Sequence, residues 1–103
     1  MKIEKEIKIA GHIVEVIRGH HFREKRGSDG LADFGGNRIL LDGGIDSESE
    51  EAQIFLHEIL HHIVYRYIGD TGILEERTIS SLTEGLFQVL RDNKLDFADR
   101  SKK

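Results

Sequence analysis

Two histidines and a glutamate near the middle of the chain have the residue types and the spacing of a metal site. His57, Glu58 and His61 form the pattern His-Glu-x-x-His. In a helix, the two imidazoles lie one turn apart on one face, where both can bind one metal ion, and Glu58 lies about 100° round the helix from His57. Neutral imidazoles are zinc ligands, and a nearby carboxylate can accept a proton from water on a zinc ion that keeps an open position. The pattern predicts a Zn²⁺ site at His57 and His61, with Glu58 as the catalytic base.

The residues around this pattern favour a helix that is half buried. At about 100° per residue the apolar side chains form one continuous arc, and His57 and His61 lie at its edge, with Glu58 a little further round. The arc consists of Phe55, Leu56, Ile59, Leu60, Ile63, Val64 and Tyr67. A position at the edge of an apolar face suits a metal site that opens into a cleft. The alternative is a buried helix whose histidines bond to backbone carbonyls.

Composition bounds the kind of protein. A chain of 103 residues has room for one domain over residues 1–103, and 38% hydrophobic content allows a modest core. The formal net charge of -4 and the pI of about 5.8 argue against a nucleic-acid binder, although residues 18–26 are locally basic. Without cysteine there is no disulfide or thiolate ligand, so His, Asp or Glu must hold any metal. No signal core or membrane-length apolar run occurs, which favours a cytoplasmic protein with no membrane partner.

The first part of the chain, residues 1–47, reads as a sheet with loops. Alternating or short apolar runs bounded by glycine predict four strands, at residues 3–9, 12–17, 31–34 and 38–42. The first two form an antiparallel hairpin, and the last two are joined by a tight turn. Residues 18–30 are expected to be a loop, either a solvated connection or a lid that brings His20 or His21 near the metal.

The second part, residues 48–93, reads as two helices. Asp46 or Ser47 caps the first, which should run from about residue 48 to 67 and stop at Gly69. The second should begin near Leu74 and continue to about Asp92, with Gly85 allowing close packing on the first helix. Its predicted apolar face consists of Ile79, Leu82, Leu86, Val89 and Leu90. Residues 94–103 are expected to be a flexible tail.

The chain resembles the small zincin-like metallopeptidases of phages and mobile elements, of the glutamate type. The resemblance covers residues 30–93 and rests on the motif helix and on the stretches 32–34, 39–42 and 86–93. It implies a minimal zincin-like α+β fold, a small antiparallel or mixed sheet of about four strands followed by two packed helices. It also implies that residues 38–42 form an exposed edge strand along which a peptide or protein substrate lies.

The third metal ligand is less well defined by the sequence. The resemblance implies a Glu on the helix that follows the motif, and a carboxylate where this chain has Ser80. If the two helices form an antiparallel pair about a turn near residue 71, residue 83 lies level with the histidines, which makes Glu84 the predicted ligand and Glu76 the alternative. His62 lies about 100° from His61, so we expect a partly exposed histidine outside the site.

Two functions follow. The first is a zinc-dependent peptidase that hydrolyses a peptide bond with a water activated by Glu58, the metal being held by His57, His61 and Glu84. The second is a non-catalytic metal-binding or interaction protein with a degenerate zincin site, which the departure at Ser80 favours.

Overall fold

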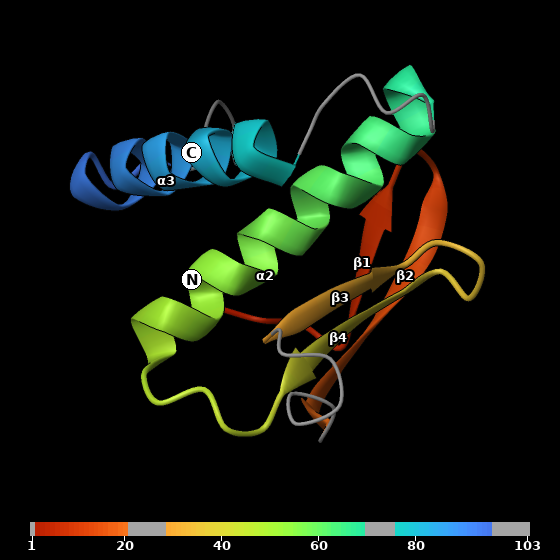
Figure 1. Ribbon diagram of the computed structural model, residues 1–103, viewed down its shortest axis with the longest axis horizontal. Helices are drawn as coiled ribbons and strands as arrows, with labels where there is room; N and C mark the ends of the chain where they lie inside the picture. The colour runs from red at the N-terminus through yellow and green to blue at the C-terminus, as the bar shows by residue number, and fades with distance from the viewer. Residues whose placement is uncertain (1, 21–28, 70–75, 96–103) are drawn as a thin grey trace, which may run out of the picture.

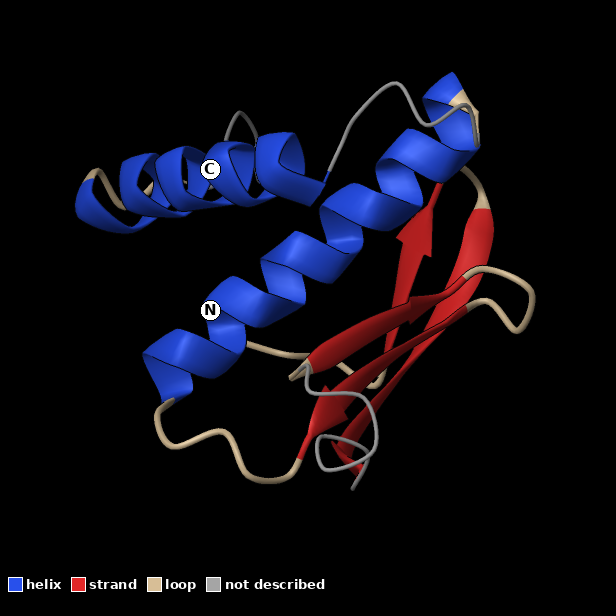
Figure 2. Ribbon diagram, in the orientation of Figure 1, coloured by secondary structure: helices blue, strands red, loops and turns tan. Residues whose placement is uncertain are grey.

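A four-stranded mixed sheet is followed by two helices, which confirms the predicted α+β fold (Figure 2). The structure is a computed structural model, and it describes residues 2–20, 29–69 and 76–95. The elements are β1 (Glu6–Ile9), β2 (His12–His20), β3 (Gly30–Asp33), β4 (Arg38–Asp42), α2 (Glu48–Ile63), the π-helical turn η1 (Val64–Ile68) and α3 (Glu76–Asp92). In Figure 1, α2 lies between the sheet and α3, so the motif helix has a neighbour on both sides.

The strand order is β1-β2-β4-β3, and it contradicts one prediction. β1 and β2 form the expected antiparallel hairpin, β4 pairs parallel with β2, and β3 pairs antiparallel with β4. Residues 38–42 are therefore a central strand, and the prediction that they form an exposed edge is wrong. The run Ile39-Leu40-Leu41 has relative exposures of 0%, 7% and 0%, and such a continuous apolar run is typical of a strand buried on both faces. Among the described strands, β3 is the edge strand that lies next to the motif helix.

Strand β2 is longer than predicted. It continues through His20, so Arg18 is a strand residue and not part of a loop. The Arg18 guanidinium donates two hydrogen bonds to the Glu51 carboxylate, at 3.1 and 2.5 Å, and joins β2 to the first turns of α2. The expected lid over residues 21–28, with His21 and the side chain of His20, lies outside the described residues.

Helix α2 begins as predicted. The Glu50 backbone N–H donates to Ser47 Oγ at 3.0 Å, so Ser47 is the N-cap, and acidic residues fill the first turn. Helical backbone continues through α2 and η1 to Ile68, one residue past the predicted end, and stops at Gly69 with φ of 102°. The main core lies between α2 and the sheet and consists of Ile9, Val14, Val16, Ile39, Leu41 and Phe55.

Helix α3 buries a different face from the predicted one. Ile79, Thr83 and Phe87 are buried, whereas Leu82, Leu86 and Val89 are 53%, 39% and 41% exposed, so most of the predicted face is wrong. Gly85 is open as well, because a Cβ built there meets no atom within 4 Å. The buried stripe has a spacing of four and includes a polar residue, so hydrophobicity alone does not identify it. No helix in the described ranges is long and apolar enough to cross a membrane.

The predicted C-terminal tail begins inside the described chain. The backbone N–H groups of Asn93, Lys94 and Leu95 donate to carbonyls in the last turns of α3, and Lys94 has φ of 52°. Lys94 and Leu95 therefore close the helix, since a residue in the left-handed region commonly ends one. The rest of the predicted tail, residues 96–103, lies outside the described residues.

Candidate metal centre

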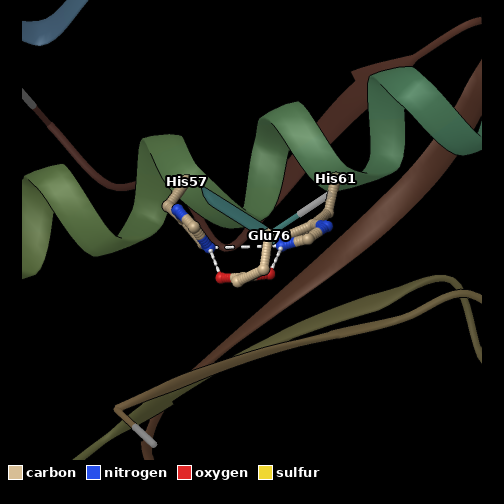
Figure 3. Close-up of side chains that lie close together, drawn as sticks. All are labelled: His57, His61 and Glu76. Atoms are coloured by element: carbon tan, nitrogen blue, oxygen red, sulfur yellow. Dashed lines mark hydrogen bonds and ion pairs between the residues drawn. The ribbon is translucent and has the colours of Figure 1, made fainter. Parts of the chain in front are cut away.

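His57 and His61 of α2 meet the carboxylate of Glu76, the first residue of α3 (Figure 3). Glu76 Oε1 lies 2.6 Å from His57 Nε2, and Glu76 Oε2 lies 2.8 Å from His61 Nε2. The two Nε2 atoms are 3.2 Å apart. In the part of the chain that the structure describes, this is the one group of three His, Cys, Asp or Glu side chains close enough to hold a metal ion. The two imidazoles thus share a metal-sized space, as the helical spacing predicts.

The donor set fits a divalent metal ion. Zinc binds imidazole nitrogen and carboxylate oxygen at about 2.0–2.2 Å in tetrahedral sites, which places neighbouring ligand atoms about 3.3 Å apart. The separation of the two Nε2 atoms matches this value, whereas Glu76 lies closer, at hydrogen-bond distance. The Glu76 side chain is 66% exposed at the start of its helix, so it has room to withdraw by roughly 0.6 Å to ligand distance. Three protein ligands would leave a fourth position free.

The metal group contains Glu76, the alternative ligand of the sequence prediction, and not Glu84. Residue 83 does lie level with the histidines, since Thr83 Oγ1 is 3.5 Å from His57 Nδ1. Glu76 precedes Thr83 by seven residues, two helical turns, and so shares its face, whereas Glu84 is about 100° further round. The prediction of Glu84 used only the position along α3 and did not include which face of α3 is turned towards α2. Glu84 instead lines the neighbouring cleft, as does Ser80.

A cleft of about 410 Å³ adjoins the metal group and lies between α2, α3 and the beginning of β3. Of its lining residues within the described ranges, five are acidic and none is Lys or Arg. These acidic residues are Asp29, Glu50, Glu58, Glu76 and Glu84. An acidic lining of this kind favours cations over anions in the cleft.

Glu58 is buried beside this cleft, with a relative exposure of 6%. Burial, and to a lesser extent the charge of Glu76, raises the pKa of Glu58 to about 8. At about 100° per residue the sequence places Glu58 beyond the apolar arc. In the structure, however, the backbone of β3 covers the Glu58 side chain. A Cβ added at Gly30 would lie 2.7 Å from Glu58 Oε2, so this glycine lets the strand approach the carboxylate closely.

The two histidines are half buried, and His61 is in the form that binds metal. His57 and His61 have side chains that are 17% and 22% exposed, which matches the half-buried position predicted for them. Burial lowers the pKa of His61 despite the opposing effect of Glu76, so the neutral imidazole is favoured. Neutral imidazole nitrogen is the form that coordinates metal ions.

His62 has a structural position, and the prediction that it is partly exposed is wrong. Its exposure is 0%, its Nε2 lies 2.9 Å from the Arg38 carbonyl oxygen, and its ring packs edge-on against Phe34. Burial lowers the pKa of His62. A signal was present in the sequence, because His62 follows Phe55 by seven residues and so lies at the same end of the apolar arc. The contact of His62 with the Arg38 carbonyl oxygen links α2 to β4, and His62 is not part of the metal group.

Comparison with known proteins gives no match: no family model, no curated protein and no solved structure is similar to this chain.

Proposed function

We propose that the protein is a zinc-dependent metallopeptidase of the zincin type, in which His57, His61 and Glu76 hold the metal and Glu58 is the general base. The observation that carries the proposal is the convergence of these three ligand side chains beside a cleft that also contains a buried carboxyl group. Two imidazoles and one carboxylate form the ligand set of zinc hydrolases such as thermolysin. The resemblance of the sequence to small zincin-like proteins supports the same reaction.

The proposed reaction assigns proton transfer to Glu58. When bound, a zinc ion acidifies a water molecule and polarises a carbonyl group. Glu58 lines the same cleft as His57 and Glu76, and it accepts the proton of the attacking water and donates it to the leaving amine. With a divalent cation held by His57, His61 and Glu76, the effects of burial and of Glu76 on the pKa of Glu58 would be opposed, which would favour the charged form that can accept a proton.

The outer edge of β3, at residues 31–33, is the proposed site for the peptide backbone. Among the described strands β3 pairs with β4 alone, and its first residue, Gly30, lies against Glu58. A peptide added to this edge would gain main-chain hydrogen bonds that do not depend on its sequence, and would pass the metal group. The acidic lining of the cleft favours substrates with Lys or Arg near the scissile bond, with Glu84 and Glu50 among the carboxylates available to them.

A specific observation favours a second candidate, a non-catalytic metal-binding or interaction protein. Glu76 bonds to both imidazoles at 2.6 and 2.8 Å, so the three side chains satisfy one another without a metal ion. Such an ion pair can join α2 to α3 in a protein that has no catalytic activity.

The experiment that separates the two candidates compares the wild type with Glu58→Gln and Glu84→Gln. We expect about one equivalent of zinc in all three proteins. Cleavage of a fluorogenic peptide library should be retained in Glu84→Gln for peptides without basic residues, and should fall at least about 100-fold in Glu58→Gln. Zinc binding without cleavage by the wild type would support the second candidate. Failure of the wild type to bind zinc at excess metal would exclude the peptidase and leave, of the second candidate, only an interaction protein without metal.

A further inference from the structure

A buried threonine lies behind the metal group, on the side of His57 that faces α3. Thr83 has a relative exposure of 2%, and the proposed reaction does not use it. Its Oγ1 lies 3.5 Å from His57 Nδ1 and 2.7 Å from the carbonyl oxygen of Ile79. Thr83 therefore contacts the ring nitrogen that is opposite the one facing Glu76.

The number of hydrogens decides what Thr83 can do. A threonine hydroxyl has one hydrogen and two lone pairs, and a carbonyl oxygen can only accept. Thr83 donates its hydrogen to Ile79, because that bond is short and the carbonyl has no hydrogen to give. Towards His57 the hydroxyl can then only accept, so the hydrogen between them must belong to Nδ1.

We propose that Thr83 is a positioning residue that holds His57 with its proton on Nδ1 and thereby leaves the Nε2 lone pair for the metal. The inference rests on the proposed metal site and adds the group that orients one of its ligands. Metal-bound histidines commonly donate their second N–H to an acceptor, which fixes the ring and raises its basicity as a ligand. Here the acceptor is the Thr83 hydroxyl, which is already oriented by its hydrogen bond to the Ile79 carbonyl oxygen.

The metal-free geometry shows why this assistance matters. Glu76 Oε1 lies 2.6 Å from His57 Nε2, on the side of the ring opposite the one that Thr83 contacts. A metal ligand must offer the Nε2 lone pair, so the ring hydrogen has to be on Nδ1. Since Thr83 can only accept, it stabilises this form of the ring. Glu76 and Thr83 lie on one face of α3, so the packing of this helix delivers a ligand and the orienting group together.

The test replaces the hydroxyl without changing the shape of the side chain. Thr83→Val removes it, Thr83→Ser retains it, and Thr78→Val makes the same change at an exposed position of the same helix. Zinc affinity is measured by competition with a chromophoric chelator. We expect Thr83→Val to bind zinc about tenfold more weakly than the wild type. This is the low end of the loss of affinity usual for removal of a histidine's hydrogen-bond partner, because the 3.5 Å contact is long. The zinc affinities of the other two variants should stay within about threefold of the wild type.

A second measurement needs no variant. In ¹⁵N and ¹H NMR spectra of the zinc-loaded wild type, we expect His57 to bind through Nε2 and to retain a slowly exchanging hydrogen on Nδ1. Wild-type zinc affinity in a folded Thr83→Val protein, or ligation of His57 through Nδ1, would overturn the inference and leave the metal site intact. A wild type that binds no zinc would instead overturn the proposed function.

Discussion

The burial of Glu58 makes a quantitative prediction about the metal-free protein. The carboxyl group has a pKa of about 8 in the fold, against an ordinary value of 4.5, chiefly because burial penalises its charged form. Between these two values the folded protein keeps a proton that the unfolded chain has released. The free energy of unfolding therefore falls as the pH rises through this window, and levels off above it.

The magnitude follows from the size of the shift. Each pH unit between the two pKa values lowers the contribution of Glu58 to the free energy of unfolding by about 1.4 kcal/mol. By pH 7 this free energy has fallen by about 3 kcal/mol. Glu58→Gln has nearly the same shape and does not titrate. In chelator, the variant should match the wild type in pH dependence below pH 4.5, and should gain about 3 kcal/mol relative to it by pH 7.

The assay is urea unfolding, followed by circular dichroism at several pH values from 4 to 9 in the presence of chelator. Burial lowers the pKa values of His61 and His62, and these groups act in the opposite direction, with stability that is present above pH 6.5 and lost as the pH falls. Their effects are common to both proteins, so the difference between the two curves isolates Glu58. A difference that stays constant with pH would show that Glu58 ionises in the fold as it does in water, and would refute the burial argument.

Three further predictions test the ligand set, the approach of β3 and the helix cap. Glu76→Gln should weaken zinc binding at least about 100-fold in a chelator competition, whereas Glu84→Gln should change it less than threefold; equal effects would contradict the assignment of the third ligand. Gly30→Ala should destabilise the protein in urea unfolding, because its Cβ would lie 2.7 Å from Glu58 Oε2, whereas Gly85→Ala, with open space around it, should stabilise α3 by about 1 kcal/mol. Ser47→Ala should cost about 1 kcal/mol through loss of the N-cap bond, measured by the same unfolding assay, and no change would mean that the cap is satisfied otherwise.

Features set by local sequence could be predicted well. The four strands, the Ser47 cap and the helical run that ends at Gly69 all lie within a few residues of their predicted positions. The contact between His57 and His61 could also be predicted from local sequence. Residues four apart on a helix lie on the same face, regardless of the tertiary packing around them. Local geometry is sufficient for two ligands of the candidate site.

Features set by the packing of distant segments could not be predicted in the same way. The parallel pairing of β2 with β4 makes residues 38–42 a central strand, and it pairs residues that are more than 20 positions apart in the sequence. The identity of the third ligand depends on which face of α3 is turned towards α2. The pattern of apolar residues in α3 does not predict that orientation. The burial of Glu58 likewise depends on β3, whose first glycine admits the backbone to contact distance.

The face that α3 buries is not its most apolar one. Its most apolar stripe contains Leu82, Leu86 and Val89, and burying it would contribute more hydrophobic free energy than burying a stripe that contains a threonine. That rotation, however, would carry Glu76 and Thr83 away from the two imidazoles, since both lie on the face now turned towards α2. Departures from the simplest packing rule are expected where function imposes its own geometry. The orientation of α3 is therefore the one that the proposed metal site requires.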